Sequence, residues 1–359
     1  MNRLMKSRAM LLVRRFTALP LSLLLLGGSL LFIVTPGLRM FAARADADAG
    51  RYEVSELRYQ GWTGQVLFPE LAEDLGYLAP IHLKWVGNTI SGPQDIQSVV
   101  TGDTDFGGAF NGSIVKAIAA HAPITAVIAY YGADKGTYTG LYVLNGSAIK
   151  GARDLIGKKV GMNTLGAYQE YLLTDYLLRS GLTAEDIKHI TLVAAPPVSL
   201  AQTLRQGRID ATFLSDIIRD KAVAQGGIHP LVTDFDVYGP FSLGSYVLTD
   251  KFIADKPNAA GKFVEATARA IEWARTTPRP QVIARLEQIT KRRQRAEDPT
   301  LVDYWQSPGV AGRGGLISDQ EFASYIDWYV RIGQLKPGEV KASDVYTNRL
   351  NPFRDMAAK

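Results

Sequence analysis

Apolar and polar positions follow one another along the chain in a repeated order: a short apolar run, a polar loop with glycine, and an amphipathic segment. The order is clearest in residues 154–182. Here a strand at 160–162 and a loop at 163–167 precede a helix whose apolar residues recur at three- and four-residue steps and which ends at Gly181. Such a junction aims backbone N–H groups and the positive end of the helix dipole at the loop. We therefore expect residues 163–167 to bind a small anion or a polar head group.

The same order occurs three times before this segment and is repeated after it. Strands that alternate with helices at this spacing indicate an α/β fold with mostly parallel sheets in two lobes. We expect residues 52–144 and 243–359, with the C-terminal helices, to form lobe 1 and residues 145–242 to form lobe 2. Ligands of open α/β sheets bind beyond the carboxyl ends of the strands, where the polar loops begin. The expected strands are 53–60, 81–86, 104–109, 124–130, 140–144, 160–162, 189–193, 209–214 and 240–248.

The first 45 residues differ from the rest, because they hold seven Lys and Arg residues, no acid, and an apolar run at 16–34. With Ala43-Arg44-Ala45 as a small-x-small cleavage site, this segment predicts a secretory signal peptide at residues 1–45 and a periplasmic location. An uncleaved membrane anchor is the alternative.

Composition excludes several functions. Beyond residue 45 the chain holds 33 basic and 35 acidic residues, so it offers no broad positive surface and we expect no nucleic-acid binding. The absence of cysteine excludes disulfides, thiolate metal sites and a cysteine nucleophile. The four histidines have no metal-ligand spacing, so we expect no metal, no cofactor and no catalytic residue.

Five motifs in order carry a resemblance to a known family. They are LRYQGW (57–62), GDTDFGGA (102–109), DLIGKKVG (154–161), LLRSGL (177–182) and LRQGRIDATF (204–213). Through them the chain resembles the periplasmic substrate-binding proteins of ABC importers, in the SsuA- and NMT1-like subgroup for aliphatic sulfonates, taurine, nitrate and thiamine-precursor pyrimidines. The tail at 322–353 is also similar. The resemblance implies a two-lobed type II periplasmic binding protein fold with two hinge crossings and a helical C-terminal tail. It further implies a monomer whose partner is an ABC permease in the inner membrane.

We expect ligand contacts from loops of both lobes. The candidates in lobe 1 are Gly61, Trp62, Thr63, Gln65, Asn88, Ser91, Gly92, Phe110 and Asn111. The candidates around lobe 2 are Thr164, Gly166, Ala167, Tyr168, Ser215, Asp216 and Ser242. Ordinary packing and helix capping are the alternatives for these residues; for Asp216 the choice is between a ligand ammonium group and its own helix N-terminus.

None of these loops carries Lys or Arg, so N–H groups, hydroxyls and amides would have to hold an anionic head group. This suits a sulfonate or a zwitterion. The sequence therefore predicts a non-catalytic solute-binding protein for an aliphatic sulfonate or a taurine-like ligand. The alternatives are an enzyme of the same fold that acts on a pyrimidine or sulfur compound, binding of an aminopyrimidine or nitrate, and a membrane-anchored sensor domain.

Overall fold

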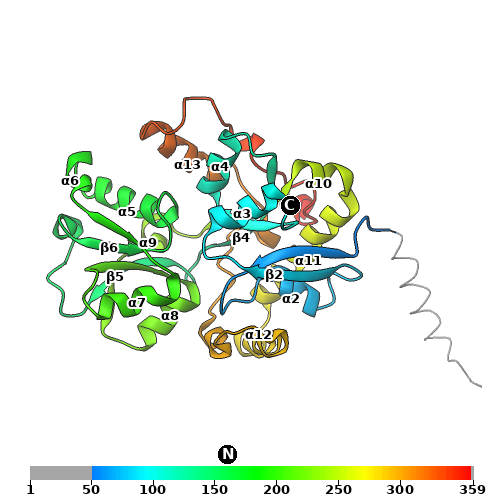
Figure 1. The fold of residues 1–359 in the computed structure, drawn as a ribbon, viewed down its shortest axis with the longest axis horizontal. Helices are drawn as coiled ribbons and strands as arrows, with labels where there is room; N and C mark the ends of the chain where they lie inside the picture. Colours follow the sequence, from blue (N-terminus) through cyan, green and yellow to red (C-terminus); the bar gives the residue numbers. More distant parts are fainter. Residues whose placement is uncertain (1–50, 357–359) are drawn as a thin grey trace, which may run out of the picture. The chain divides into compact units, whose positions relative to one another are not determined.

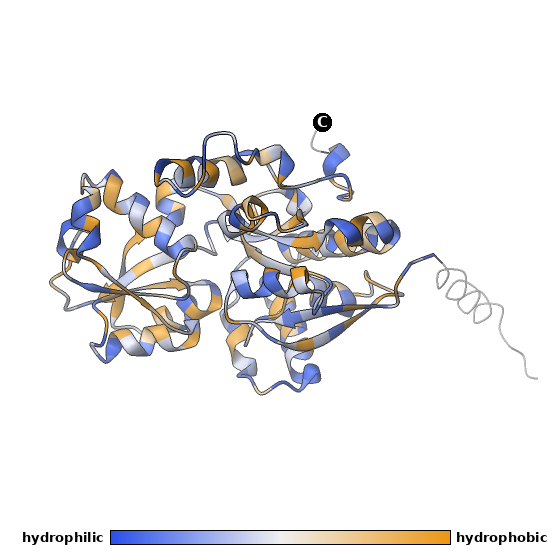
Figure 2. Cartoon of the chain, turned by 45° about the horizontal axis from the view of Figure 1, so that its top comes forward, coloured by the Kyte–Doolittle hydropathy of each residue, from blue (hydrophilic) through white to orange (hydrophobic). Residues whose placement is uncertain are grey.

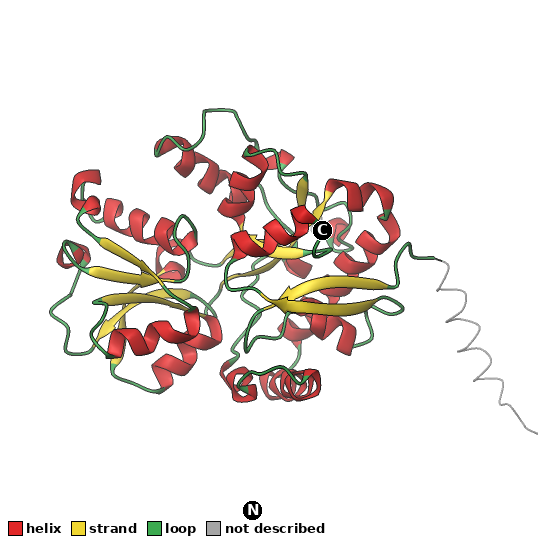
Figure 3. Cartoon of the chain, viewed as in Figure 1, coloured by secondary structure: helices red, strands yellow, loops and turns green. Residues whose placement is uncertain are grey.

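The computed structural model describes residues 51–356, so the predicted signal peptide or anchor at residues 1–45 lies outside the described residues. Within residues 51–356 the strands form three sheets (Figure 3). The first sheet pairs β1 (Glu56–Gly61) with β2 (His82–Asn88). The order of the second sheet is β3 (Gly107–Phe110), β10 (Phe241–Thr249), β4 (Ile124–Ala133). The order of the third sheet is β7 (Thr191–Ala194), β6 (Lys159–Met162), β8 (Ala211–Ser215), β5 (Thr139–Leu144), β9 (Ile228–Thr233).

Helices connect and cover these strands. We call the first two sheets and their helices the first lobe, and the third sheet and its helices the second lobe. The helices of the first lobe are α2 (Phe68–Asp74), α3 (Gly92–Thr101), α4 (Asn111–Ala119), α10 (Asp250–Asp255), α11 (Pro257–Thr276), α12 (Arg279–Arg293) and α13 (Gln320–Arg331). The helices of the second lobe are α5 (Tyr168–Arg179), α6 (Ala184–Lys188), α7 (Pro197–Arg205), α8 (Asp216–Ala224) and α9 (Asp234–Tyr238). Helices α5 and α6 lie on one face of the third sheet, and α7 and α8 lie on the other (Figure 1).

Local sequence signals set the ends of the two helices that begin at polar loops. Helix α3 starts after Ser91, whose hydroxyl accepts a hydrogen bond from the Gln94 backbone N–H at 3.4 Å. It ends at Gly102, which has a φ of 80° that only glycine adopts without strain. Helix α5 ends before Gly181, as the sequence predicts.

The direction of the strands corrects one expectation. Three strand pairs are parallel, β1–β2, β6–β7 and β6–β8, whereas β10 runs antiparallel to β3 and β4, and β5 runs antiparallel to β8 and β9. The prediction of mostly parallel sheets is therefore wrong. The chain enters both antiparallel strands from the other lobe, β5 after residues 134–138 and β10 after residues 239–240. Each strand therefore runs in the direction opposite to its neighbours in the sheet.

The pairing also shifts one proposed lobe boundary. Strand β5 lies in the third sheet, although the sequence analysis assigned residues 140–144 to lobe 1. The proposed crossing therefore moves to residues 134–138. Strand β9 and helix α9 were not among the predicted elements, because Pro230 and the polar residues around it break the apolar pattern of residues 228–233.

Hydrophobic residues concentrate on the strands and on the helix faces that turn toward them (Figure 2). One buried cluster extends from Phe106 and Phe263 in the first lobe to Leu172 and Val160 in the second. A separate cluster around Leu204 fills the space between the third sheet and α7 and α8. None of the helices within residues 51–356 is both long enough and apolar enough to cross a bilayer.

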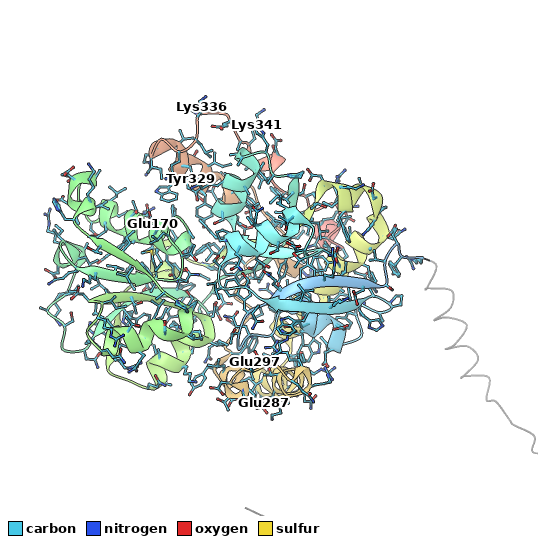
Figure 4. The ribbon with its side chains drawn as sticks, viewed as in Figure 1. Glu170, Glu287, Glu297, Tyr329, Lys336 and Lys341 are labelled. Carbon is cyan, nitrogen blue, oxygen red and sulfur yellow. The ribbon has the colours of Figure 1, made fainter. Side chains whose placement is uncertain are left out.

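Aromatic side chains join the two lobes on the side of α5 and α13. The ring of Tyr171 on α5 lies 5.0 Å from the rings of both Tyr325 and Trp328 on α13, and the ring of Tyr168 lies 5.4 Å from that of Phe110. Glu170 of α5 and Tyr329 of α13 mark the same pair of helices in Figure 4. These contacts make the core continuous from one lobe to the other.

Candidate functional site

A cavity of about 240 Å³ lies between side chains of the first and the second lobe. It is reached by the segments that follow β1, β2, β6 and β7, by the carboxyl ends of β3, β4 and β8, and by the start of the antiparallel strand β5. This is the edge at which open α/β sheets bind ligands. Among the described residues that line the cavity none is Lys, Arg or His, and the charged ones are Asp216 and Asp220.

Asp216, the first residue of α8, is the most unusual residue of the cavity. Its φ is 49°, in the left-handed region that non-glycine residues seldom adopt and that Asp and Asn tolerate best. Its carboxylate has no hydrogen bond or ion pair with any residue in the described part of the chain. Burial raises the pKa of Asp216 to about 6, against the opposing effect of Arg219 and with a further increase from Asp220.

Arg219 does not neutralise Asp216 because it is engaged elsewhere. Its guanidinium donates to the carbonyl oxygens of Tyr138 at 3.1 Å and Gly136 at 2.8 Å, and to the Asp220 carboxylate at 2.9 Å. The side chain is almost fully buried, so these bonds fix it to the crossing at residues 134–138. Asp220 is therefore the paired carboxylate of the cavity and Asp216 the unpaired one.

Hydroxyl and amide groups of the second lobe surround these acids. The Ser215 hydroxyl lies 2.9 Å from that of Thr139, and the Gln169 side chain accepts from the Asn163 backbone N–H at 2.8 Å. The Thr164 hydroxyl is buried and has no hydrogen-bond partner among the described residues. It is therefore free to bond with a molecule in the cavity.

Tyr168 connects the cavity to a second buried acid. Its hydroxyl donates to Asp234 at 2.9 Å, and the same carboxylate accepts from the Thr139 backbone N–H at 3.0 Å. Burial raises the pKa of Asp234 to about 7, although both bonds oppose the increase. Tyr168 thus has a structural partner for its hydroxyl and presents only its ring to the cavity.

The first lobe contributes a stack of tyrosines. The rings of Tyr130 and Tyr246 are stacked with 4.0 Å between centroids, and Tyr131 lies 4.7 Å from Tyr130. Burial, and after it the Asp216 carboxylate, raises the pKa of Tyr131, and Asp216 and the three tyrosines line the same cavity. The Tyr246 hydroxyl is buried without a hydrogen-bond partner in residues 51–356.

Trp62 and Gln65 belong to a loop that α12 and the segment after it hold in place. Arg293 donates to the Gln65 carbonyl oxygen at 2.9 Å, and Glu297 accepts from the Gly64 backbone N–H at 2.8 Å. Glu297 lies beside α12 in Figure 4. Because Arg293 also pairs with Glu297, the loop is fixed by a closed set of charge-assisted bonds.

Apolar side chains, five aliphatic and one aromatic, form a recess at the first-lobe part of the cavity. It is built between α2, α11, α12 and the short helix η2 (Pro299–Tyr304). Its side chains are nearly all buried, so the recess is enclosed by the core of the first lobe. The recess residues are Phe68, Leu71, Ala274, Val282, Leu286 and Val302.

Nine of the sixteen predicted residues line the cavity. They are Trp62, Gln65, Gly92, Phe110, Thr164, Ala167, Tyr168, Ser215 and Asp216. The other seven do not line it, and they are Gly61, Thr63, Asn88, Ser91, Asn111, Gly166 and Ser242.

Local contacts explain why five of these seven lie elsewhere. The Asn88 amide donates to the Thr63 hydroxyl at 3.2 Å, and its oxygen accepts from Trp85 at 3.1 Å, so Gly61, Thr63 and Asn88 surround Trp85 outside the cavity. Ser91 caps α3. Gly166 is exposed, with a φ of 69°, and its N–H is bound to Glu170 at 2.7 Å.

Asn111 and Ser242 are fully buried and satisfied by protein groups. Asn111 accepts from the Ser245 hydroxyl at 2.9 Å and donates to the Glu321 carbonyl oxygen at 3.2 Å. Ser242 donates its N–H to the Glu321 carboxylate at 3.1 Å and accepts from the Ala311 N–H at 3.2 Å. Both residues attach α13 and the segment before it to β10.

Several lining residues were absent from the prediction. Tyr130 and Tyr131 end a predicted strand, and an aromatic pair at a strand's carboxyl end is a signal that could have identified them. Asp220 lies one helical turn after Asp216 and could have been found by that spacing. Trp305 and the recess residues come from α2, α11, α12 and the segment at 299–308. No local sequence pattern indicates that these segments meet at the cavity.

Comparison with known proteins decides the family. The sequence model of the family described as NMT1/THI5 like matches residues 71–280, which is more than half of the chain. The chain belongs to the NMT1/THI5-like family. The resemblance found in its motifs is thereby confirmed. No curated protein matches the sequence of this family member.

Solved structures agree on the fold. The alkanesulfonate-binding protein SsuA from Xanthomonas axonopodis pv. citri, bound to MOPS, is similar with a TM-score of 0.65 at 20% identity over 82% of this chain and 99% of that one. The nitrate-binding protein NrtA from Synechocystis PCC 6803 has a TM-score of 0.64 at 13% identity over 86% and 89%. The desulfurization enzyme DszB has a TM-score of 0.56 at 16% identity over 83% and 97%. The predicted two-lobed periplasmic binding protein fold with a helical C-terminal tail is confirmed.

The site offers hydroxyl, amide, aromatic and carboxylate groups. Within residues 51–356 no group of three or more His, Asp or Glu side chains is placed to bind a metal ion. The acids of the cavity have no His or Lys partner among its lining residues to form a nucleophile and base pair. Its chemistry is hydrogen bonding, aromatic contact and one unpaired negative charge.

Proposed function

We propose that this member of the NMT1/THI5-like family is the solute-binding component of an ABC-type importer. In this proposal it is exported to the periplasm as a monomer, binds a small organic solute between its lobes, and delivers the solute to a permease in the inner membrane. The observation that carries the proposal is the cavity lined by both lobes. A ligand that contacts both walls stabilises the closed arrangement over any more open one.

The binding role has support from the relatives and from the cavity. Solved relatives include an alkanesulfonate-binding and a nitrate-binding protein. Two buried hydroxyls, of Thr164 and Tyr246, have no partner in the described residues and are available to a solute. A sulfonate or taurine-like ligand, an aminopyrimidine and nitrate are the ligand classes to test.

A thermal-shift screen of the purified protein tests the proposal. Sulfonates, taurine, nitrate, aromatic acids and aminopyrimidines are added singly, and a solute present at 100 times its Kd is expected to stabilise the protein by about 2.7 kcal/mol. Each hit is then incubated with the protein and recovered. Recovery of unchanged solute supports binding, whereas conversion to a product would favour an enzyme. Failure of every one of these solute classes, and of an added class of alkylammonium ions, to shift the melting temperature would contradict the proposal.

A further inference from the structure

The charge pattern of the cavity differs from that of a site built for an anion. Asp216 and Asp220 are its charged side chains, and no basic side chain lines it within the described residues. Asp220 is paired with Arg219, so the uncompensated charge belongs to Asp216. A sulfonate or carboxylate placed here would meet that charge without a guanidinium or ammonium group to offset it.

Helix N-termini do little to remedy this deficit. Six helices of the described chain place their N-cap or first residues at the cavity, namely α2, α3, α4, α5, α7 and α8. Prolines stand in the first turns of α2, α3 and α7 and have no N–H to offer. Glu170 and Asp216 occupy the first turns of α5 and α8 and offset the positive ends of those helix dipoles. The first turn of α4 has neither a proline nor an acidic residue, so the attraction of helix N-termini for an anion is concentrated there.

The surroundings of Asp216 suit a cation. Tyr130, Tyr131 and Tyr246 line the same cavity as Asp216, and tyrosine faces attract ammonium groups over distances of up to about 6 Å. A carboxylate and aromatic faces in one cavity neutralise a cation and replace its water shell at the same time. Asp216 is partly buried and its carboxylate has no partner among the described residues, which costs free energy in the empty protein, and a cationic ligand removes that cost.

The apolar recess can accommodate the apolar part of the ligand. It opens into the same cavity as Asp216 and carries no polar side chain among Phe68, Leu71, Ala274, Val282, Leu286 and Val302. Water in such a recess gains few hydrogen bonds, so an alkyl or aromatic group displaces it favourably.

From these features we propose that the cavity binds an organic cation, with its positive group paired to the Asp216 carboxylate beside the tyrosine stack and its apolar body in the recess. The inference rests on the proposed solute-binding function and names the ligand's charge and shape. A zwitterion qualifies where its cationic group takes the place at Asp216.

Probes of equal length and different charge test the inference. Hexylammonium, hexan-1-ol and hexane-1-sulfonate are titrated calorimetrically into the purified protein. We expect hexylammonium to bind at least tenfold more tightly than hexanol, and hexanesulfonate to bind most weakly. Shortening the ammonium probe to butyl is expected to weaken binding roughly three- to fourfold for each methylene lost.

Two matched variants test whether the Asp216 carboxylate binds the ammonium group. Asp216→Asn keeps the side-chain shape and the tolerance of a positive φ, and it should lower hexylammonium affinity at least tenfold while hexanol binding changes less than twofold. Asp250→Asn alters the first residue of α10, outside the cavity, and should leave both affinities unchanged. Circular dichroism and melting curves confirm that each variant is folded.

The outcomes separate this inference from the proposed function. Tighter binding of hexanesulfonate than of hexylammonium would overturn the inference that the ligand is a cation. An Asp216→Asn variant that binds hexylammonium as tightly as the parent protein does would overturn it as well. Either result would leave the proposed solute-binding function intact. If none of the three probes binds and the solute screen is also negative, both proposals fail.

Discussion

The first lobe lines the cavity mainly with aromatic and aliphatic side chains, whereas the second lobe contributes both carboxylates and more of the Ser, Thr, Asn and Gln side chains, beside apolar residues such as Leu200 and Phe213. The first wall offers apolar area, which attracts any solute with an apolar surface and has little directional preference. The second wall offers a charge and hydrogen-bonding groups at fixed positions, which discriminate between solutes. The comparison suggests that affinity and selectivity are divided between the lobes.

Tyr168 is where the two walls meet, and its removal is expected to have the largest effect. Its ring packs against Phe110 of the first lobe while its hydroxyl bonds to Asp234 of the second. Tyr168→Ala should lower the free energy of unfolding by about 3–5 kcal/mol, as for other buried aromatics. Tyr168→Phe should cost only about 1 kcal/mol, because the ring stays and one hydrogen bond is lost. Urea unfolding measures both. Equal losses would mean that the ring contact does not join the walls.

Asp216 should make the second wall less stable than it could be. Its pKa of about 6 in the folded protein lies above the ordinary value of 3.8, so the folded state binds the proton more tightly than the unfolded state does. The carboxylate therefore lowers stability above pH 6, and this cost disappears as the pH falls from 6 toward 4. At pH 7.5 Asp216→Asn should unfold with a free energy on the order of 1–3 kcal/mol higher than the parent, and at pH 4 the two should agree.

Neighbouring groups set the conditions of this pH measurement. Asp220 and Arg219 of α8, Tyr131 of β4 and Asp234 of α9 face or influence Asp216. All four are present in both proteins, but Asp220 and Asp234 interact with the Asp216 charge and titrate together with it, so the double variants Asp216→Asn/Asp220→Asn and Asp216→Asn/Asp234→Asn separate their share of the difference. A stability difference that does not change between pH 7.5 and pH 4 would contradict an unpaired carboxylate at this position.

Two glycines of the predicted site, Gly92 on the first wall and Gly166 outside the cavity, should respond differently to an added methyl group. At Gly92 a Cβ atom would lie 2.9 Å from the Ala109 backbone, so Gly92→Ala overpacks the contact of α3 with β3 and should cost about 1–3 kcal/mol. Gly166 has no atom within 4 Å of such a Cβ, and Gly166→Ala should cost only about 1 kcal/mol for its positive φ. Hexylammonium affinity should be unchanged in Gly166→Ala. Weaker binding of hexylammonium by Gly166→Ala would show that Gly166 contributes to the binding site after all.

The sequence predicted the second wall better than the first, for a physical reason. Residues such as Thr164, Tyr168 and Asp216 follow a buried strand directly, and strand geometry alone brings them to the sheet edge. The first wall is assembled from segments far apart in the chain. Trp305 and Leu286 reach it only through the packing of α11 and α12, which hydrophobic periodicity does not encode.

Polar residues at predicted loops were the least reliable guide. Asn111 and Thr164 both follow strands that end at the sheet edge. The Asn111 side chain is hydrogen-bonded to Ser245 and Glu321, whereas Thr164 lines the cavity and its hydroxyl has no hydrogen-bond partner among the described residues. The difference depends on α13, whose residue Glu321 lies 210 positions after Asn111 in the chain. The direction of the strands could not be predicted in the same way. Alternation of strands and helices indicates an α/β fold, but β5 and β10 run antiparallel to their neighbours because the chain enters them from the other lobe.

The smallest effect is expected where the lobes touch through a single exposed ion pair. Lys221 of α8 lies 2.8 Å from Asp298, which precedes η2, and the two side chains are 33% and 43% exposed. Hydrogen bonds from Lys221 and then Thr300 lower the pKa of Asp298 to about 2, so any stabilisation is present above the ordinary value of 3.8 and is lost as the pH falls toward 2. Because water screens the pair, Lys221→Ala should cost at most about 0.5 kcal/mol at low salt and nothing measurable at 0.5 M salt. Lys188→Ala is the matched control, since its partner Glu185 is also 2.8 Å away but within α6 of the second lobe. A loss above 1 kcal/mol that persists at high salt for Lys221→Ala alone would show that this contact, and not the aromatic one at Tyr168, holds the two walls together.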